Sequence, residues 1–323
     1  MHEPTFRQAI TRSWQLVAQK KSLWIFGLLS AVIGQMGLSD FVGMLYKTAN
    51  EGFRIYKLNL FFEFFSAWNW HKVSVVLLML WFVGIILILL AAIIFVAVSA
   101  RGAIIAYAIH WYKKDSILLL SDAWNKGVHK FFPLLAISAV GRSLQLIIIY
   151  LFSLLALRLV QNGTLSSNLL LILSAGAGLF LALVIESVSI YSSGYLLLQK
   201  EELIRAVKKG WNLFLDHLMV SLELGIVLML FSAVFLGIVI YGSFIAFIPS
   251  FLMWIVAGFS GLKFLVGFGI YTGVALYSAL VLVVAGVFNA FVTCAWVYLF
   301  MKMHHEGVVS RVIHFLKNLF RRS

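Results

Sequence analysis

The chain carries the stretch Ala9-Ile-Thr-Arg12-Ser13-Trp14 and two further copies of its pattern, Ala123-Trp-Asn-Lys126-Gly127-Val128 and Ala206-Val-Lys-Lys209-Gly210-Trp211. In each copy an alanine is followed by two variable residues, a cation, a small residue and an apolar residue. Each copy lies on a short segment that leads directly into a long apolar one. We therefore expect one structural unit that is built three times.

The three short segments are amphipathic at helical spacing. Apolar and small residues recur three and four positions apart, and the opposite face carries cations, as in a helix that lies in a membrane surface. The tail over 309–323 has the same pattern and predicts a fourth surface helix. The residues expected to contact membrane lipid are Arg12, Trp14, Lys126, Lys130, Lys208, Lys209, Trp211, Arg311, Lys317, Arg321 and Arg322.

The composition indicates a polytopic membrane protein. Of the 323 residues, 63% are apolar and 11% are charged, whereas soluble domains have about 25% charged residues. The 25 Lys and Arg outnumber the 12 Asp and Glu, a balance that can indicate nucleic-acid binding. Here the cations stand in small groups at the ends of apolar runs, which is a topology signal. We therefore expect no nucleic-acid partner.

Six apolar runs predict six spans, over 23–39, 73–112, 132–159, 169–198, 218–247 and within 264–300. The second run, about 60 Å long as one helix, must protrude from the bilayer or bend near Arg101-Gly102. Pro249 is expected to end the fifth span. Residues 249–263 are then either re-entrant or interfacial, because a further span there would change the side on which the chain ends.

The distribution of cations predicts the topology. Seventeen Lys and Arg fall on the segments that would face the cytoplasm and six on the opposite side, which places both termini in the cytoplasm. The expected fold is all-α, a multi-pass inner-membrane protein with six transmembrane helices as three hairpins, each preceded by an amphipathic interfacial helix. A single transmembrane domain over 1–323 would contain repeat units at 1–112, 113–199 and 200–303 and a basic tail at 304–323.

The opening stretch Arg12-Ser-Trp-Gln-Leu-Val-Ala-Gln-Lys-Lys-Ser-Leu-Trp-Ile-Phe-Gly27 is similar to the start of a broad group of prokaryotic six-span membrane proteins. That group resembles the membrane domain of glycerophosphoryl diester phosphodiesterases and related uncharacterised membrane families. The segments ending in Lys126-Gly127 and Lys209-Gly210 fit the same group. The resemblance implies a six-helix bundle with membrane-surface helices. It implies little about activity, since the phosphodiesterases carry their chemistry in a separate soluble barrel that is not expected here.

Four ionisable residues lie inside apolar runs: Arg101, Arg142, Glu186 and Glu223. Each stands ~18–21 Å along its helix from the cytoplasmic cations, and Gln35 and Asn289 fall at similar depth. A charge inside the membrane is costly unless it is paired. The residues therefore form either a polar pathway or ion pairs that fix helix order, with Arg142 and Glu186 as expected partners. Arg101 alternatively snorkels to the interface.

No paired aspartates, nucleophile elbow or phosphate-cradling glycine loop is present, so we expect no catalytic activity, cofactor or metal. Asp216 is interpreted as the cap where the third surface segment turns into its span. The predicted function is that of a non-catalytic membrane protein that is structural or binds anionic lipids, a membrane-protein partner or a second copy. The alternative is a transporter or channel for a small solute or lipid that uses the buried charges.

Overall fold

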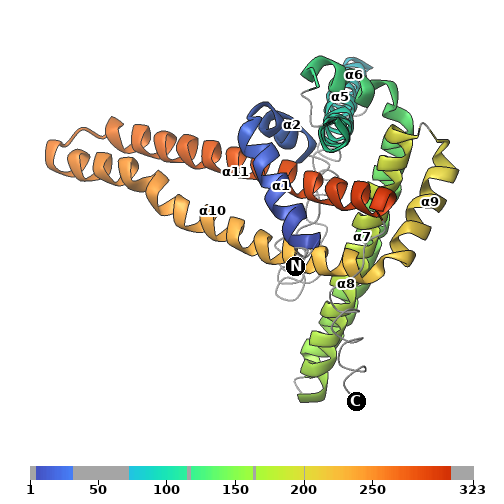
Figure 1. Cartoon of the computed structure of the whole chain (residues 1–323). Helices are drawn as coiled ribbons and strands as arrows, with labels where there is room; N and C mark the ends of the chain where they lie inside the picture. Colours follow the sequence, from blue (N-terminus) through green and yellow to red (C-terminus); the bar gives the residue numbers. More distant parts are fainter. Residues whose placement is uncertain (1–4, 32–72, 115–117, 163–164, 200, 307–323) are drawn as a thin grey trace.

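The structure, a computed structural model, describes residues 5–31, 73–114, 118–162, 165–199 and 201–306 (Figure 1). Within these ranges the chain forms helices and no strands, which confirms the all-α prediction. The helices are α1 (Thr5–Gln19), α2 (Ser22–Ala31), α5 (Val73–Lys114), α6 (Leu120–His129), α7 (Phe131–Asn162), α8 (Leu165–Leu198), α9 (Leu203–Asp216), α10 (Leu218–Ser260) and α11 (Phe264–Glu306).

Five of these helices are long and apolar enough to cross a membrane, namely α5, α7, α8, α10 and α11. The shortest, α7, has 32 residues and the longest have 43, so they measure ~48–65 Å. A bilayer core is ~30 Å thick, and helices of this length cross it only when tilted or when they extend beyond it. The first predicted span begins as α2, and its remaining residues lie outside the described ranges.

The interior of the protein forms where the C-terminal halves of three long helices meet. Residues 97–109 of α5, 187–196 of α8 and 287–303 of α11 supply most of the buried side chains, and these three helices contact one another. The helices α1, α2, α6 and α9 pack around them. We call this whole region the hub.

The remaining parts of the long helices extend outward from the hub as three arms. The N-terminal half of α5 forms one arm, the hairpin of α7 and α8 the second, and the hairpin of α10 and α11 the third. The arms point in different directions (Figure 1), and their large apolar side chains are exposed. The bundle expected from the sequence is therefore limited to the hub.

The packing of the helices repeats from unit to unit. The short amphipathic helix of each unit lies on the last helix of the preceding unit: α6 lies on α5, α9 on α8, and α1 on α11. The helices α2, α7 and α10 each contact the last helix of their own unit and that of the preceding one. Because α1 returns to α11, the three units close into a ring. At this closure Tyr112 shares a hydrogen bond of 3.0 Å with Ser13 and donates one of 3.2 Å to the Cys294 carbonyl.

The repeated sequence pattern acts as a packing element. Its alanine and its small residue are buried in all three copies: Ala9 and Ser13, Ala123 and Gly127, Ala206 and Gly210. These residues stand four apart on one helix face, a small-residue arrangement that lets two helix backbones approach closely. A Cβ atom at Gly127 would overlap the backbone of Ser99 on α5, and one at Gly210 would lie 2.8 Å from the Ser192 nitrogen on α8.

The expectation that Pro249 ends the fifth span is wrong. Helix α10 continues through Pro249 to Ser260 and is capped by Gly261, which has φ +72° and donates its N–H to the Ala257 carbonyl. A proline removes one backbone hydrogen bond, but in apolar surroundings ending the helix would leave several backbone groups unpaired. Residues 249–260 therefore belong to α10, and α11 follows after a short turn.

Helices α5 and α8 also bear on the predictions. Helix α5 runs without interruption through Arg101-Gly102, where a bend was one of the expected alternatives. Helix α8 begins at Leu165, four residues before its predicted start. The polar residues 166–168 therefore belong to its first turn.

Candidate functional site

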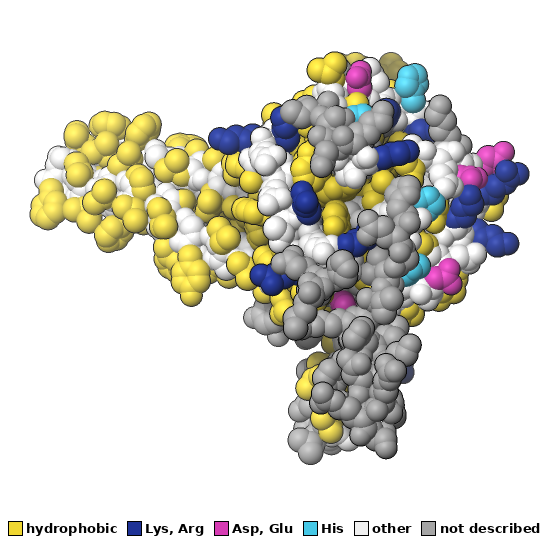
Figure 2. All heavy atoms as spheres, viewed as in Figure 1, with side chains coloured by type: hydrophobic (Ala, Val, Ile, Leu, Met, Phe, Trp, Pro, Cys, Tyr) yellow, Lys and Arg dark blue, Asp and Glu magenta, His cyan; other side chains and the backbone are white. Residues whose placement is uncertain are grey.

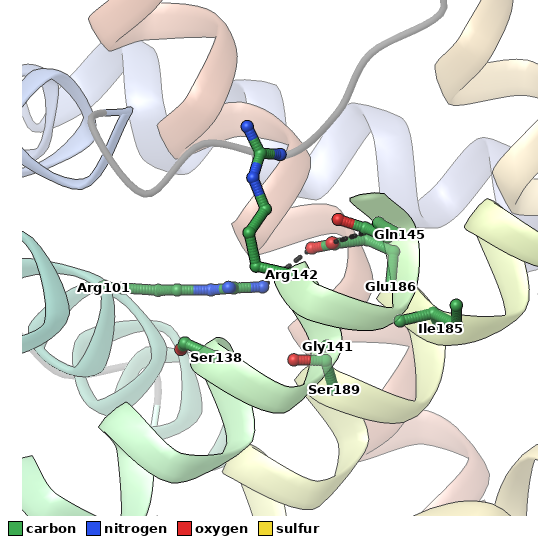
Figure 3. A pocket seen from close by; sticks show the side chains of 8 residues that line it. All are labelled: Arg101, Ser138, Gly141, Arg142, Gln145, Ile185, Glu186 and Ser189. Atoms are coloured by element: carbon green, nitrogen blue, oxygen red, sulfur yellow. Dashed lines mark hydrogen bonds and ion pairs between the residues drawn. The ribbon is translucent and has the colours of Figure 1, made fainter. Parts of the chain in front are cut away.

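A buried ion pair joins the first two units inside the hub. Arg101 on α5 donates a hydrogen bond of 2.7 Å from its guanidinium to Oε1 of Glu186 on α8. The two side chains are only 11% and 15% exposed. On α7, Gln145 donates to the other carboxylate oxygen of Glu186 at 3.4 Å (Figure 3). Both carboxylate oxygens thus have a donor, as a buried charge requires.

The surroundings of this ion pair leave almost no free space. The residues that line it are Arg101, Ser138, Gly141, Arg142, Gln145, Ile185, Glu186 and Ser189, and we call them the charged cluster. The cavity between them has a volume of about 10 Å³, which holds at most one water molecule. In this structure the cluster joins three helices and offers no room for a solute.

The partner predicted for Glu186 was Arg142, and the described ion pair joins Glu186 to Arg101 instead. Arg142 lies in the same cluster, but its guanidinium extends away from the Glu186 carboxylate (Figure 3). The predicted depth in the membrane was similar for Arg101, Arg142 and Glu186. A shared depth does not show which of two arginines on neighbouring helices pairs with Glu186. The ion pair with Glu186 also argues against the alternative in which the Arg101 side chain snorkels to the membrane interface.

The other residues predicted at this depth lie elsewhere. Asn289 on α11 donates hydrogen bonds to the Gly27 carbonyl at 2.9 Å and to the Ser30 hydroxyl at 2.7 Å, both on α2. Glu223 on α10 is not among the residues of the charged cluster. Gln35 lies outside the described residues. The predicted layer is therefore divided among separate contacts.

A third buried polar contact joins the second and third units. Tyr191 on α8 and Ser221 on α10 share a hydrogen bond of 2.8 Å, and both side chains are almost fully buried. Each boundary between units thus has at least one buried polar contact between side chains: Arg101–Glu186, Tyr191–Ser221 and Asn289–Ser30. Gln145, Tyr191 and Ser221 were not predicted from the sequence. An amide inside an apolar run was a usable signal for Gln145, whereas serine and tyrosine are too common in spans to stand out.

The cations of the repeated pattern lie on the outside of the hub. Arg12, Lys126, Lys208 and Lys209 are exposed and Lys130 is partly exposed. Trp14 and Trp211 are 48% and 45% exposed. Figure 2 shows Lys and Arg side chains over the hub, while the arm of α10 and α11 is almost entirely hydrophobic. The predicted lipid contacts Arg311, Lys317, Arg321 and Arg322 lie outside the described residues.

No protein-family model, no curated protein and no solved structure matches this chain. The resemblance to six-span membrane families therefore stays a prediction. Among the described residues, no group of three or more His, Cys, Asp or Glu side chains is placed to hold a metal ion.

Proposed function

We propose that this chain is a non-catalytic integral protein of the inner membrane, whose arms cross the bilayer and whose hub binds anionic lipid at the cytoplasmic surface. In this proposal six spans form three hairpins and both termini are cytoplasmic. The observation that carries the proposal is the separation of charge between hub and arms. Between Glu223 and Lys302 the chain has one charged residue, Lys263, in the turn at the tip of its arm.

The surface of the arms supports their place in lipid. Their exposed side chains are mainly Leu, Ile, Val, Phe, Trp and Tyr, and apolar surface left in water costs ~25 cal/mol per Å². The hub presents lysines, arginines and half-exposed tryptophans, which is the composition of a membrane–water interface. Each cation near an anionic leaflet contributes about 1 kcal/mol of attraction.

Lipid titration of the purified full-length protein tests this proposal. Native mass spectrometry would measure binding of phosphatidylglycerol and phosphatidylcholine to the wild type and to the triple variant Lys126→Gln, Lys130→Gln, Lys208→Gln. We expect the triple variant to lose at least fivefold in affinity for phosphatidylglycerol and to keep its affinity for phosphatidylcholine. The matched control is Lys263→Gln at the arm tip. Equal phosphatidylglycerol binding by the wild type and the triple variant would contradict the proposal.

The charged cluster supports a second candidate, a transporter or channel. Two arginines and a glutamate lie beside a space of about one water molecule where two units meet, and proton or ion pathways have such residues. Flux assays in proteoliposomes distinguish the two functions. Flux that is present in the wild type and absent from a folded Glu186→Gln variant would favour transport, and absence of flux in both would favour the lipid-binding proposal.

A further inference from the structure

A second hollow lies on the outside of the hub, where α8, α9 and α11 meet. It has a volume of about 280 Å³, and its walls include Tyr195, Lys209, Asn212, Leu213, Asp216 and His304. It is far larger than the space in the charged cluster and is lined by a cation, an anion and an amide.

The three polar residues form one stripe along α9. Lys209, Asn212 and Asp216 stand three and four positions apart, and such positions share a face of a helix. Lys209 and Asp216 are two turns apart, or about 10 Å along the helix axis. A ligand that reaches both residues must therefore carry groups of opposite charge, separated by several bonds.

Lys209 is held in position by two hydrogen bonds and has a third N–H donor. Its ammonium donates to Gln199 at 3.0 Å and to Glu201 at 2.6 Å, and it lies 5.8 Å from the centre of the Tyr195 ring. An ammonium has three N–H donors, so one remains for a ligand.

The side chains of Asn212 and Asp216 make no hydrogen bond or ion pair within the part of the chain that the structure describes. The predicted cap role of Asp216 is not observed: the residue between α9 and α10 is His217, and α10 begins without a side-chain cap. Both side chains are exposed at the hollow, so their polar atoms are accessible to a bound molecule.

We infer that this hollow binds a phosphoethanolamine group, the headgroup of a zwitterionic phospholipid. Lys209 and Asn212 donate hydrogen bonds to the phosphate oxygens, and the primary ammonium of the ligand donates to the Asp216 carboxylate. A simple anion is disfavoured by Asp216 and by Glu201, and a simple cation by Lys209.

The position of the hollow favours a lipid as the source of this group. Asp216 lies at the end of α9, immediately before α10 enters its arm, and the neighbouring Leu215 and Met219 are 49% and 42% exposed. These side chains provide an apolar surface for acyl chains beside the polar stripe. The inference rests on the proposed function in one respect, since it places α9 at the membrane surface.

The test compares two lipids that differ only in their ammonium group. The full-length protein is titrated with dioleoyl phosphatidylethanolamine and with dioleoyl phosphatidylcholine, and bound lipid is counted by native mass spectrometry. Phosphatidylcholine has the same phosphate but no N–H donor for Asp216. We expect about tenfold tighter binding of phosphatidylethanolamine, because a hydrogen bond between charged groups contributes an energy of that order. Equal binding of the two lipids would overturn the inference.

Substitutions in two surface helices provide the matched comparison. Asp216→Asn is expected to reduce phosphatidylethanolamine binding to the phosphatidylcholine level, whereas Asp122→Asn, an exposed position on α6, leaves it unchanged. An unchanged preference in Asp216→Asn would overturn the inference. Neither substitution is expected to weaken phosphatidylglycerol binding, so failure of this inference is distinguishable from failure of the proposed function.

Soluble glycerophosphoethanolamine identifies the source of the ligand. If it displaces the lipid at comparable concentration, the site recognises the free headgroup. If it does not, and the lipid preference persists, the site requires the acyl chains as well. Both results support recognition of phosphoethanolamine.

Discussion

The hub and the outward faces of the arms differ in how closely other helices approach them. In the hub, a Cβ atom at Gly27 would overlap the Gly286 carbonyl, and one at Gly286 would lie 2.6 Å from the Trp24 carbonyl. On the outward faces of the arms, Gly84 and Gly258 have no atom within 4 Å of an added Cβ, whereas inside the hairpin of α10 and α11 a Cβ at Gly273 would overlap the Ser250 hydroxyl. The hub is thus held by close backbone packing and buried polar contacts, whereas the outward faces of the arms present exposed apolar side chains. Changes in the hub should therefore be costly, and equivalent changes on the outward faces of the arms should not.

The largest expected effect is in the charged cluster. Glu186→Leu leaves the Arg101 guanidinium without its carboxylate, and breaking a buried ion pair from one side costs about 3–5 kcal/mol. The free energy of unfolding, measured by SDS-titrated unfolding in mixed micelles, should fall by about that amount.

Double variants then identify the partner of Glu186. Arg101→Leu combined with Glu186→Leu should recover much of the lost stability, because no unpaired charge remains. Arg142→Leu combined with Glu186→Leu should recover little. Larger recovery with Arg142 would restore the pairing expected from the sequence and contradict the geometry described above.

A smaller loss is expected from Gly27→Ala in the hub. The added methyl group meets backbone atoms of Gly286, which cannot rotate away, and overpacking of this kind costs about 1–3 kcal/mol. Gly84→Ala in an arm should instead be neutral or stabilising by up to about 1 kcal/mol, since alanine is the better helix former. Thermal unfolding in detergent compares the two variants, and equal losses of stability would remove the distinction between hub and arms.

The smallest effect concerns the boundary between the second and third units. Tyr191→Phe removes the hydroxyl that bonds Ser221, and a buried hydrogen bond of this type contributes about 1 kcal/mol. The Ser221→Ala variant and the double variant should lose similar amounts, because all three lack the same bond. Additive losses in the double variant would show that the two hydroxyls act independently.

Much of the hub could be predicted from the sequence, because the Lys-Gly pattern and the apolar runs are local signals. The three short amphipathic helices form where they were expected. The role of Gly127 and Gly210 as packing contacts could not be predicted, because it depends on which helix lies beneath them. The same limit applies to the charged cluster: its residues share a depth, but only the packing of α5 against α8 selects Arg101 over Arg142. The prediction that Pro249 ends a helix was wrong because that rule holds best in water, where the backbone groups at a helix end can bind solvent.

The central claim is that the arms cross the bilayer while the cationic surface of the hub stays on the cytoplasmic side. Cys294 is the only cysteine and is buried, so a Cys294→Ala background allows single cysteines to be placed at Lys208 on the hub and at Lys263 on the arm tip. A membrane-impermeant maleimide applied to spheroplasts measures their accessibility. We predict labelling of Lys263→Cys in intact spheroplasts and of Lys208→Cys only after the membrane is opened. Labelling of both positions from the same side would contradict the account.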